Sequence, residues 1–209
     1  MIDLYTWTTP NGRKVSIMLE ELGLAYRAIA VDINANEQFA PAFLAMSPNN
    51  KIPAIVDHDT GYSLMESGAI LLYLADKTGR LKGGGKHGWQ VIEWLMLQMG
   101  NVGPMLGQAH HFLKFNRGKS EYAERRYADE AQRLYGVLDR RLAEAEYLAG
   151  EYSIADIATW PWVARFEWQD IDLNGFPHVK RWYVAIAKRP AVQRGYDQPK
   201  QVAPIPMPA

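Results

Sequence analysis

The chain opens with two short apolar runs that flank an amphipathic helical pattern. Residues 1–7, MIDLYTW, are rich in strand-forming side chains, and residues 26–32, YRAIAVD, form the second run. Between them, residues 11–23 repeat apolar side chains at helical spacing and close on a glycine. Two strands separated by a helix are typical of a parallel βαβ unit, which is therefore predicted for the start of the chain.

A second block combines two strands with a helix. PAFLAM, residues 41–46, is at most a short helix. Residues 53–59 and 62–67 are predicted to form antiparallel strands joined by a tight Thr-Gly turn. Residues 67–79, SGAILLYLADKTG, have an amphipathic helical pattern with a serine at the expected cap and a glycine at the end. The predicted order is therefore βαβ followed by ββα.

The pattern changes at residues 81–88, LKGGGKHG, whose glycines and lysines are typical of a linker. No strand pattern follows the linker. Apolar residues recur at helical spacing over four further segments, which are residues 89 to about 115, 120–146, 153–169 and 177–188. We therefore expect an α/β domain over residues 1–80, a linker, and an all-helical bundle over residues 89–209.

Composition narrows the class of protein. The 209 residues are 48% apolar and 22% charged, which is typical of a soluble globular protein. Basic and acidic residues balance at 23 each, so neither nucleic acid nor an anionic membrane is an expected partner. The N-terminus lacks the pattern of a secretory signal, and no run approaches the roughly 18 apolar residues of a membrane span. We expect a cytoplasmic protein.

The chain has no cysteine. This excludes disulfides, thiolate metal sites and a thiol nucleophile of the protein itself, so any reacting thiol must come from outside. His110 and His111 are adjacent, point about 100° apart on a helix, and lack a third ligand at metal spacing. We expect them in the core or in a pocket wall, and no metal site. Ser153 and Asp156 fit a capping box with a structural role.

Pro53 stands directly before a predicted strand. A proline that enters a strand through a tight turn is often cis, and a cis bond here would leave the backbone N–H and C=O of Ile52 facing outward. Such an edge can pair with an extended peptide. An ordinary loop proline explains the stretch equally well.

Glu66 and Ser67 lie where a strand ends and a helix begins. The hydroxyl and the helix N–H groups can bind a carboxylate, and the glutamate can bind an ammonium. A helix cap with a surface glutamate is the commoner meaning of such a dipeptide. Together with the Ile52-Pro53 edge, however, these residues could hold a short peptide with an α-amino-acid head.

Four motifs, TPNG, NKIPAIVD, ESGAI and YSIADI, resemble the glutathione transferase family in this order, over nearly the whole chain. TPNGRK, SPNNKIPAIVDH, GPMLGQAHHF and IADIATWPW more closely resemble the bacterial Nu-class glutathione transferases, which act as glutathione-dependent disulfide-bond oxidoreductases. The resemblance implies a thioredoxin-like first domain, a helical second domain, a homodimer, and glutathione as co-substrate.

The same resemblance implies how glutathione is held. The backbone of Ile52, beside Pro53, pairs with the cysteinyl unit, and Glu66 with Ser67 holds the γ-glutamyl head. The remaining implied contacts are Gln38 and Lys51 for the glycyl end, and Arg126, or its neighbour Arg125, across the dimer interface. Without the family, a solvated helix face would be the preferred interpretation of the two arginines.

Thr9 and Asn11 occupy the place where other classes of the family carry a catalytic Tyr, Ser or Cys. The resemblance implies that the hydroxyl of Thr9 and the amide of Asn11 lie near the glutathione sulfur. Tyr5 and Thr8 are nearby rivals, although a residue inside the strand points less directly into the cleft. A proline turn and helix cap, formed by Thr9 and Asn11, is the structural alternative.

The activity expected most is thiol–disulfide exchange by a bound glutathione thiolate. Conjugation or glutathione removal on aromatic electrophiles would use the same site. A non-catalytic glutathione-binding regulator is the alternative of another class, and it would be favoured by loss of the glutathione-holding residues, all of which are present. Candidates for the second-substrate pocket are Trp7, Met105, Phe112 and Trp168, although aromatic residues at helical spacing more often belong to a core.

Overall fold

The computed structural model describes residues 1–209, which form two compact units. The first unit comprises Met1–Lys82 together with Lys188–Ile205, and the second comprises Gly83–Ala187 together with Pro206–Ala209. The sequence pattern places all of residues 89–209 in the helical domain. Residues 188–205 instead pack with the α/β unit.

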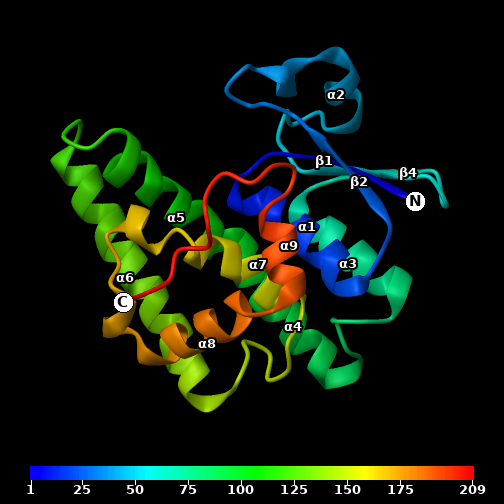
Figure 1. The fold of residues 1–209 in the computed structure, drawn as a ribbon. Coiled ribbons are helices and arrows are strands. Elements are labelled where there is room, and N and C mark those ends of the chain that lie inside the picture. Colours follow the sequence, from blue (N-terminus) through cyan, green and yellow to red (C-terminus); the bar gives the residue numbers. More distant parts are fainter. The chain divides into compact units, whose positions relative to one another are not determined.

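A four-stranded mixed sheet forms the centre of the first unit (Figure 1). Its strands are β1 (Ile2–Thr6), β2 (Tyr26–Ala30), β3 (Ala54–Asp57) and β4 (Tyr62–Met65). The order across the sheet is β2-β1-β3-β4, with β1 parallel to β2 and antiparallel to β3, and β4 antiparallel to β3. This confirms the predicted βαβ unit and the hairpin that follows it.

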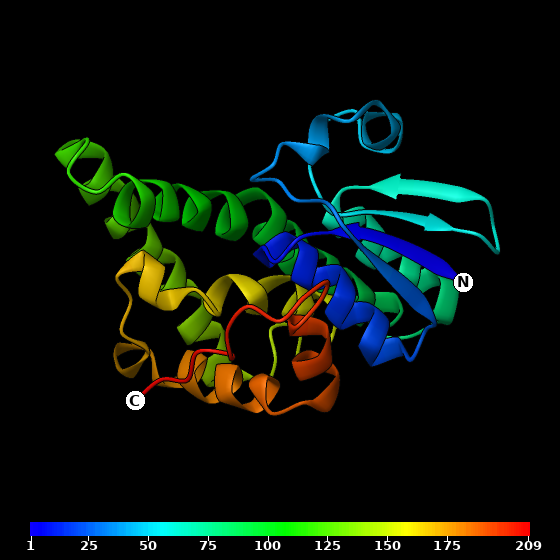
Figure 2. The ribbon, with the colours of Figure 1, turned by 45° about the horizontal axis from the view of Figure 1, so that its top comes forward.

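Helices cover both faces of this sheet. They are α1 (Pro10–Leu22), α2 (Pro41–Met46) and α3 (Ser67–Thr78). Helices α1 and α3 pack together on one face, and α2 lies on the other (Figures 1 and 2). On the α2 face, Val31, Phe43 and Ala54 form a small buried cluster. The thioredoxin-like fold of this unit is therefore as predicted.

Helix α9 (Pro190–Tyr196) packs along α1 and explains why the end of the chain belongs to the first unit. The Ser16 hydroxyl donates to the carbonyl of Gly195 at 2.6 Å. The Arg13 guanidinium lies 3.5 Å from the centroid of the Tyr196 ring. A Cβ atom on Gly195 would stand 2.6 Å from the Cα of Ile17, so only glycine allows this close approach. The sequence pattern did not predict this helix.

The second unit is all-helical, as predicted. Its helices are α4 (Gly85–Leu97), α5 (Gly103–Ala109), α6 (Glu121–Glu144), α7 (Ile154–Val163) and α8 (Pro177–Ala187). Two π-helical segments, Gln98–Val102 and His110–Phe115, prolong α4 and α5. The helix predicted over residues 153–169 is shorter than expected, because α7 ends at Val163 and a 3₁₀ turn follows at Phe166–Gln169.

Ser153 and Asp156 form the predicted capping box of α7. The backbone N–H of Ser153 donates to Asp156 at 3.0 Å. The same carboxylate also accepts from the Leu148 N–H at 3.0 Å and from the Trp182 indole at 2.8 Å, and burial raises its pKa to about 6. Its role is structural, because it joins three parts of the helical unit.

Candidate functional site

The N-terminus of α1 is capped by Thr9, whose hydroxyl oxygen accepts from the N–H of Gly12 at 3.3 Å. The backbone N–H of Thr9 donates to the carbonyl of Trp7 at 2.7 Å. A hydroxyl carries one O–H donor besides its acceptor lone pairs, and the cap uses only an acceptor. The chain offers no acceptor to the Thr9 O–H, which can therefore donate to a ligand at this helix end.

Asn11 lies in the first turn of α1 and is partly exposed. The helix begins at Pro10, directly before Asn11, and of the two residues considered for the cap it is Thr9 that occupies the cap position. The side chain of Asn11 thus stands at the positive end of the helix dipole. The side-chain amide of Asn11 is therefore a hydrogen-bond donor at the same helix end as the hydroxyl of Thr9.

Gly12 is a residue of this turn that the sequence pattern did not single out. A Cβ atom here would lie 2.2 Å from the carbonyl oxygen of Trp7 and 2.4 Å from the hydroxyl of Thr6. Only glycine therefore lets the turn close this tightly. Tyr5, a rival for the catalytic role, packs its ring against Phe43 on the α2 side of the sheet.

The Ile52-Pro53 peptide bond is cis, and Pro53 is buried beside the start of β3. Ile52 is half-buried and makes no backbone hydrogen bond within the chain. Its N–H and C=O therefore form an open edge, as the sequence predicted for a cis proline at this point. An extended peptide can pair with such an edge.

Glu66 and Ser67 stand at the N-terminus of α3, with Glu66 and not Ser67 in the cap position. Glu66 is exposed and has φ 67° and ψ 112°, a conformation that costs a non-glycine residue about 1–3 kcal/mol. Such strain clusters at ligand sites. The N–H groups of Gly68 and Ala69, in the first turn, donate to no group of the chain. They are ready donors for an anion.

Lys14 extends this helix end with a positive charge that the sequence pattern did not reveal. Its ammonium donates to the Ser67 hydroxyl at 3.4 Å, and the side chain is only 1% exposed. Burial lowers the pKa of Lys14 to about 7, while the nearby Glu66 carboxylate partly opposes the shift. A carboxylate that binds at Ser67 would bring a compensating negative charge close to Lys14.

Gln38 and Lys51 both lie in the segment between β2 and β3. Gln38 belongs to the 3₁₀ turn Glu37–Phe39, and its Oε1 atom is buried without a hydrogen-bond partner. A buried acceptor without a donor is costly, so a ligand N–H at this point would satisfy it. Lys51 is exposed, and its backbone carbonyl accepts from the Ser47 hydroxyl at 2.8 Å.

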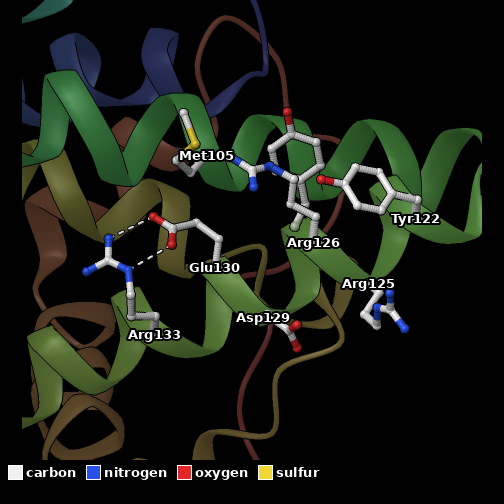
Figure 3. Close-up of a pocket in the computed structure, with 8 residues that line it drawn as sticks. Met105, Tyr122, Arg125, Arg126, Asp129, Glu130 and Arg133 are labelled. Atoms are coloured by element: carbon white, nitrogen blue, oxygen red, sulfur yellow. Dashed lines mark hydrogen bonds and ion pairs between the residues drawn. The ribbon is translucent and has the colours of Figure 1, made fainter.

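The second unit has a pocket of about 470 Å³ against α6 (Figure 3). Its lining residues are Met105, Tyr122, Arg125, Arg126, Tyr127, Asp129, Glu130 and Arg133. Glu130 and Arg133 form a bidentate ion pair with two hydrogen bonds of 2.7 Å. Figure 3 shows Arg126 extending toward Met105, whereas Arg125 points away from it. Both arginines line the pocket, and of the two only Arg126 extends toward Met105.

The aromatic candidates for the second-substrate pocket fall into both units. Trp7 belongs to the first unit. In the second unit, Phe112 stacks on Tyr127 with a centroid distance of 5.4 Å, and Met105 lines the pocket that Tyr127 also borders. Trp168 packs edge-on against His110 instead, at 5.5 Å. Met105 and Phe112 therefore both adjoin the same residue, Tyr127, in that Met105 shares a pocket with it and Phe112 stacks on it. Trp168 belongs to a different cluster, with His110.

His111 is exposed, contrary to the core or pocket-wall role predicted for both adjacent histidines, whereas His110 has the core role. Its ring stacks on Trp162 at 5.6 Å, and its Nε2 lies 2.9 Å from the amide nitrogen of Gln169. Burial lowers the pKa of His110 to about 4, so the ring is neutral at physiological pH. The structure contains no group of three or more His, Asp or Glu side chains that could hold a metal ion. None of its helices is both long and apolar enough to cross a membrane.

Comparison with known families decides where this arrangement belongs. Residues 1–76 match the family model of the glutathione S-transferase N-terminal domain, and residues 102–190 match that of the C-terminal domain. The chain belongs to the glutathione S-transferase family. The cap of α1, the Ile52 edge and the N-terminus of α3 all lie in the N-terminal domain of this glutathione transferase.

Individual relatives and solved structures show which glutathione transferases this chain is most usefully compared with. This glutathione transferase is 54% identical over 198 residues to the disulfide-bond oxidoreductase YfcG of Escherichia coli. The alignment covers 91% of this chain and 92% of YfcG. A solved glutathione transferase from Pseudomonas putida, with one glutathione disulfide bound per subunit, has a TM-score of 0.91 and 45% identity, covering 95% of this chain and 91% of that chain. One from Burkholderia graminis, with two glutathione molecules bound per subunit, has a TM-score of 0.90 and 46% identity, covering 96% and 89%.

Proposed function

We propose that this glutathione transferase is a glutathione-dependent disulfide-bond oxidoreductase, whose reacting thiol belongs to its co-substrate. The observation that carries the proposal is the unused O–H donor of Thr9 at the N-terminus of α1, in a chain without cysteine. The 54% identity to the oxidoreductase YfcG supports it.

Glutathione would lie along the first unit as an extended peptide. Its cysteinyl unit pairs with the open backbone of Ile52, next to Pro53. The γ-glutamyl carboxylate binds the N-terminal turn of α3 at Ser67, where N–H donors without acceptors support it, and the γ-glutamyl ammonium meets the exposed Glu66 carboxylate. At the glycyl end, the unmatched oxygen of Gln38 accepts an amide N–H and the exposed Lys51 pairs with the carboxylate.

The first chemical task is ionisation of the glutathione thiol. A free thiol has a pKa near 8.5, and only the thiolate attacks a disulfide. The hydroxyl of Thr9, the amide of Asn11 and the positive end of α1 stabilise the anion. One pKa unit corresponds to about 1.4 kcal/mol, which one or two donated hydrogen bonds can supply. No general base is required.

The thiolate then attacks one sulfur of the disulfide substrate. A new S–S bond forms as the substrate S–S bond breaks, and the departing thiolate takes the electron pair and then a proton. A second glutathione thiolate attacks the glutathione sulfur of this mixed disulfide and releases glutathione disulfide with the second substrate thiol. Two glutathione molecules are oxidised for each disulfide reduced, and no protein sulfur takes part.

The proposed assembly is a homodimer that works in the cytoplasm, where glutathione is kept reduced. Arg126 would approach the glutathione that the other subunit binds. Both arginines are exposed and make no ion pair, and the direction of Arg126 toward Met105 supports this role for Arg126 over Arg125 (Figure 3). Trp7, Met105, Phe112 and Trp168 remain the proposed second-substrate residues.

The proposal is tested by two assays on the purified protein. One follows glutathione-dependent reduction of hydroxyethyl disulfide, and the other follows conjugation of glutathione to an aryl halide. Disulfide reduction should be the stronger activity relative to other glutathione transferases, and it should fall in Thr9→Ala and in Asn11→Ala. Unchanged reduction in the double variant would refute the sulfur site. No glutathione binding at millimolar concentration by calorimetry would refute the enzyme itself.

A further inference from the structure

The ammonium of Lys200 lies over the indole ring of Trp7, 4.1 Å from the ring centroid. Both residues belong to the first unit, Trp7 directly after β1 and Lys200 in the segment that follows α9. Figures 1 and 2 show this segment, in red, returning toward the N-terminal end of α1. Residues almost the whole chain apart in sequence therefore meet at this point.

The backbone of Trp7 holds the turn that carries Thr9, a residue of the proposed sulfur site. Its carbonyl accepts the backbone N–H of Thr9 at 2.7 Å, and the same carbonyl forces residue 12 to be glycine. The indole is only 7% exposed. The contact with this ring therefore fixes the charge of Lys200 beside the turn that carries Thr9.

The charge of Lys200 has no anionic partner in the chain. Lys200 is exposed, and no carboxylate lies within ion-pair distance of its ammonium. It is also the only charged side chain after Asp197. A cation over an aromatic ring keeps its three N–H donors for other groups, because the ring attracts the charge without accepting a conventional hydrogen bond.

We propose that Lys200 binds a carboxylate of the disulfide substrate and thereby selects anionic disulfides over cationic ones. The inference rests on the proposed function, because the disulfide must approach the sulfur that Thr9 and Asn11 stabilise. A disulfide that carries a carboxylate a few bonds from its sulfur would place that group near the ammonium. Lys200 is then a substrate-binding residue for the reaction, and Trp7 positions it.

The experiment compares three disulfides of different charge: dithiodipropionate, an anion; hydroxyethyl disulfide, which is neutral; and cystamine, a cation. The readout is the ratio of kcat/KM for each charged disulfide to that for the neutral one, which cancels general losses of activity. Lys200→Gln should lower the dithiodipropionate ratio by about three- to five-fold, the size typical of a partly exposed ion pair. Lys200→Arg should retain the ratio, and Lys200→Glu should shift preference toward cystamine.

Lys188→Gln is the matched control. Lys188 is also an exposed lysine of the first unit, but it adjoins Arg189, whose partner Glu21 lies at the opposite end of α1. The control should keep the wild-type ratios. Salt should lower the dithiodipropionate ratio of the wild type and have less effect on that of Lys200→Gln, because counterions screen an exposed pair.

Two failures can be told apart. If the wild type reduces none of the three disulfides, the proposed function fails. If it reduces them but Lys200→Gln keeps the wild-type ratios, only the role of Lys200 fails. A rise of the KM for glutathione with the neutral disulfide, without a change of the ratios, would assign Lys200 to glutathione and overturn the inference.

Discussion

The ammonium of Lys14 donates to the hydroxyl of Ser67 at 3.4 Å, and both side chains are buried at the N-terminal turn of α3. Burial of a lysine is costly, since the charged form loses its hydration. The arrangement is explicable if an anion completes it, because a carboxylate bound at Ser67 would stabilise the charge of Lys14. The N-terminus of α3 and the buried lysine thus form one proposed anion site.

Replacement of Lys14 by Met should change how stability depends on pH. The folded pKa of Lys14 is about 7 and its ordinary value is 10.5. Between these values the unfolded chain binds more protons than the folded one, so Lys14 makes the free energy of unfolding rise with pH. The difference between wild type and Lys14→Met should therefore rise by about 1.4 kcal/mol per pH unit above pH 7. Urea unfolding at a series of pH values measures it, and a flat difference would contradict a lowered pKa.

Gly12→Ala should destabilise the first unit by about 2–3 kcal/mol, because the new methyl group would meet the carbonyl of Trp7 and the hydroxyl of Thr6. Gly136→Ala, within α6, is the matched control. Its methyl group would have only the flexible end of Arg140 nearby, at 3.5 Å, so the same change should stabilise that helix by about 0.5–1 kcal/mol. Thermal unfolding of both variants measures the effects. Equal shifts would show that the turn does not require glycine.

Arg126→Ala should raise the KM for glutathione by roughly ten-fold, the cost of losing a hydrogen bond to a charged group. Arg125→Ala should raise it less than about two-fold, because Arg125 points away from Met105 (Figure 3). The two variants remove the same charge from adjacent positions, so each controls for the other. Initial rates over a range of glutathione concentrations give the KM of each variant. An equal rise of KM in both would contradict the assignment of Arg126 rather than Arg125 to glutathione.

Local features of the site could be predicted from the sequence. The strand-turn-helix at Thr9 depends on turn residues a few positions apart. For Pro53 the sequence allows a cis bond and an ordinary loop proline equally, and the structure has the cis bond. The strand and helix before and after Glu66 follow from their hydrophobic periods. Each of these predictions needs only short-range chemistry, and the fold confirms these elements.

Long-range packing could not be predicted. The helical stripe of α1 accounts for Val15 and Leu19, but Arg13, Lys14 and Ser16 are buried as well. The Arg13 and Ser16 side chains are covered by α9, which joins the first unit from the far end of the sequence. A lysine in a polar stretch gives no sign of such burial. The contact between Lys200 and Trp7 has the same origin.

The central claim is that the chain lowers the pKa of a glutathione thiol without a cysteine of its own. Thr9→Gly tests the hydroxyl with little cost to the helix, since glycine is tolerated at this cap. The most direct measurement is a pH titration of the ultraviolet thiolate absorbance of glutathione bound to the wild type and to the Thr9→Gly, Asn11→Ala double variant. We predict a pKa at least about one unit below 8.5 on the wild type and a return toward 8.5 on the double variant. A bound thiol that titrates like free glutathione on the wild type, or an unchanged lowered value on the double variant, would contradict the account.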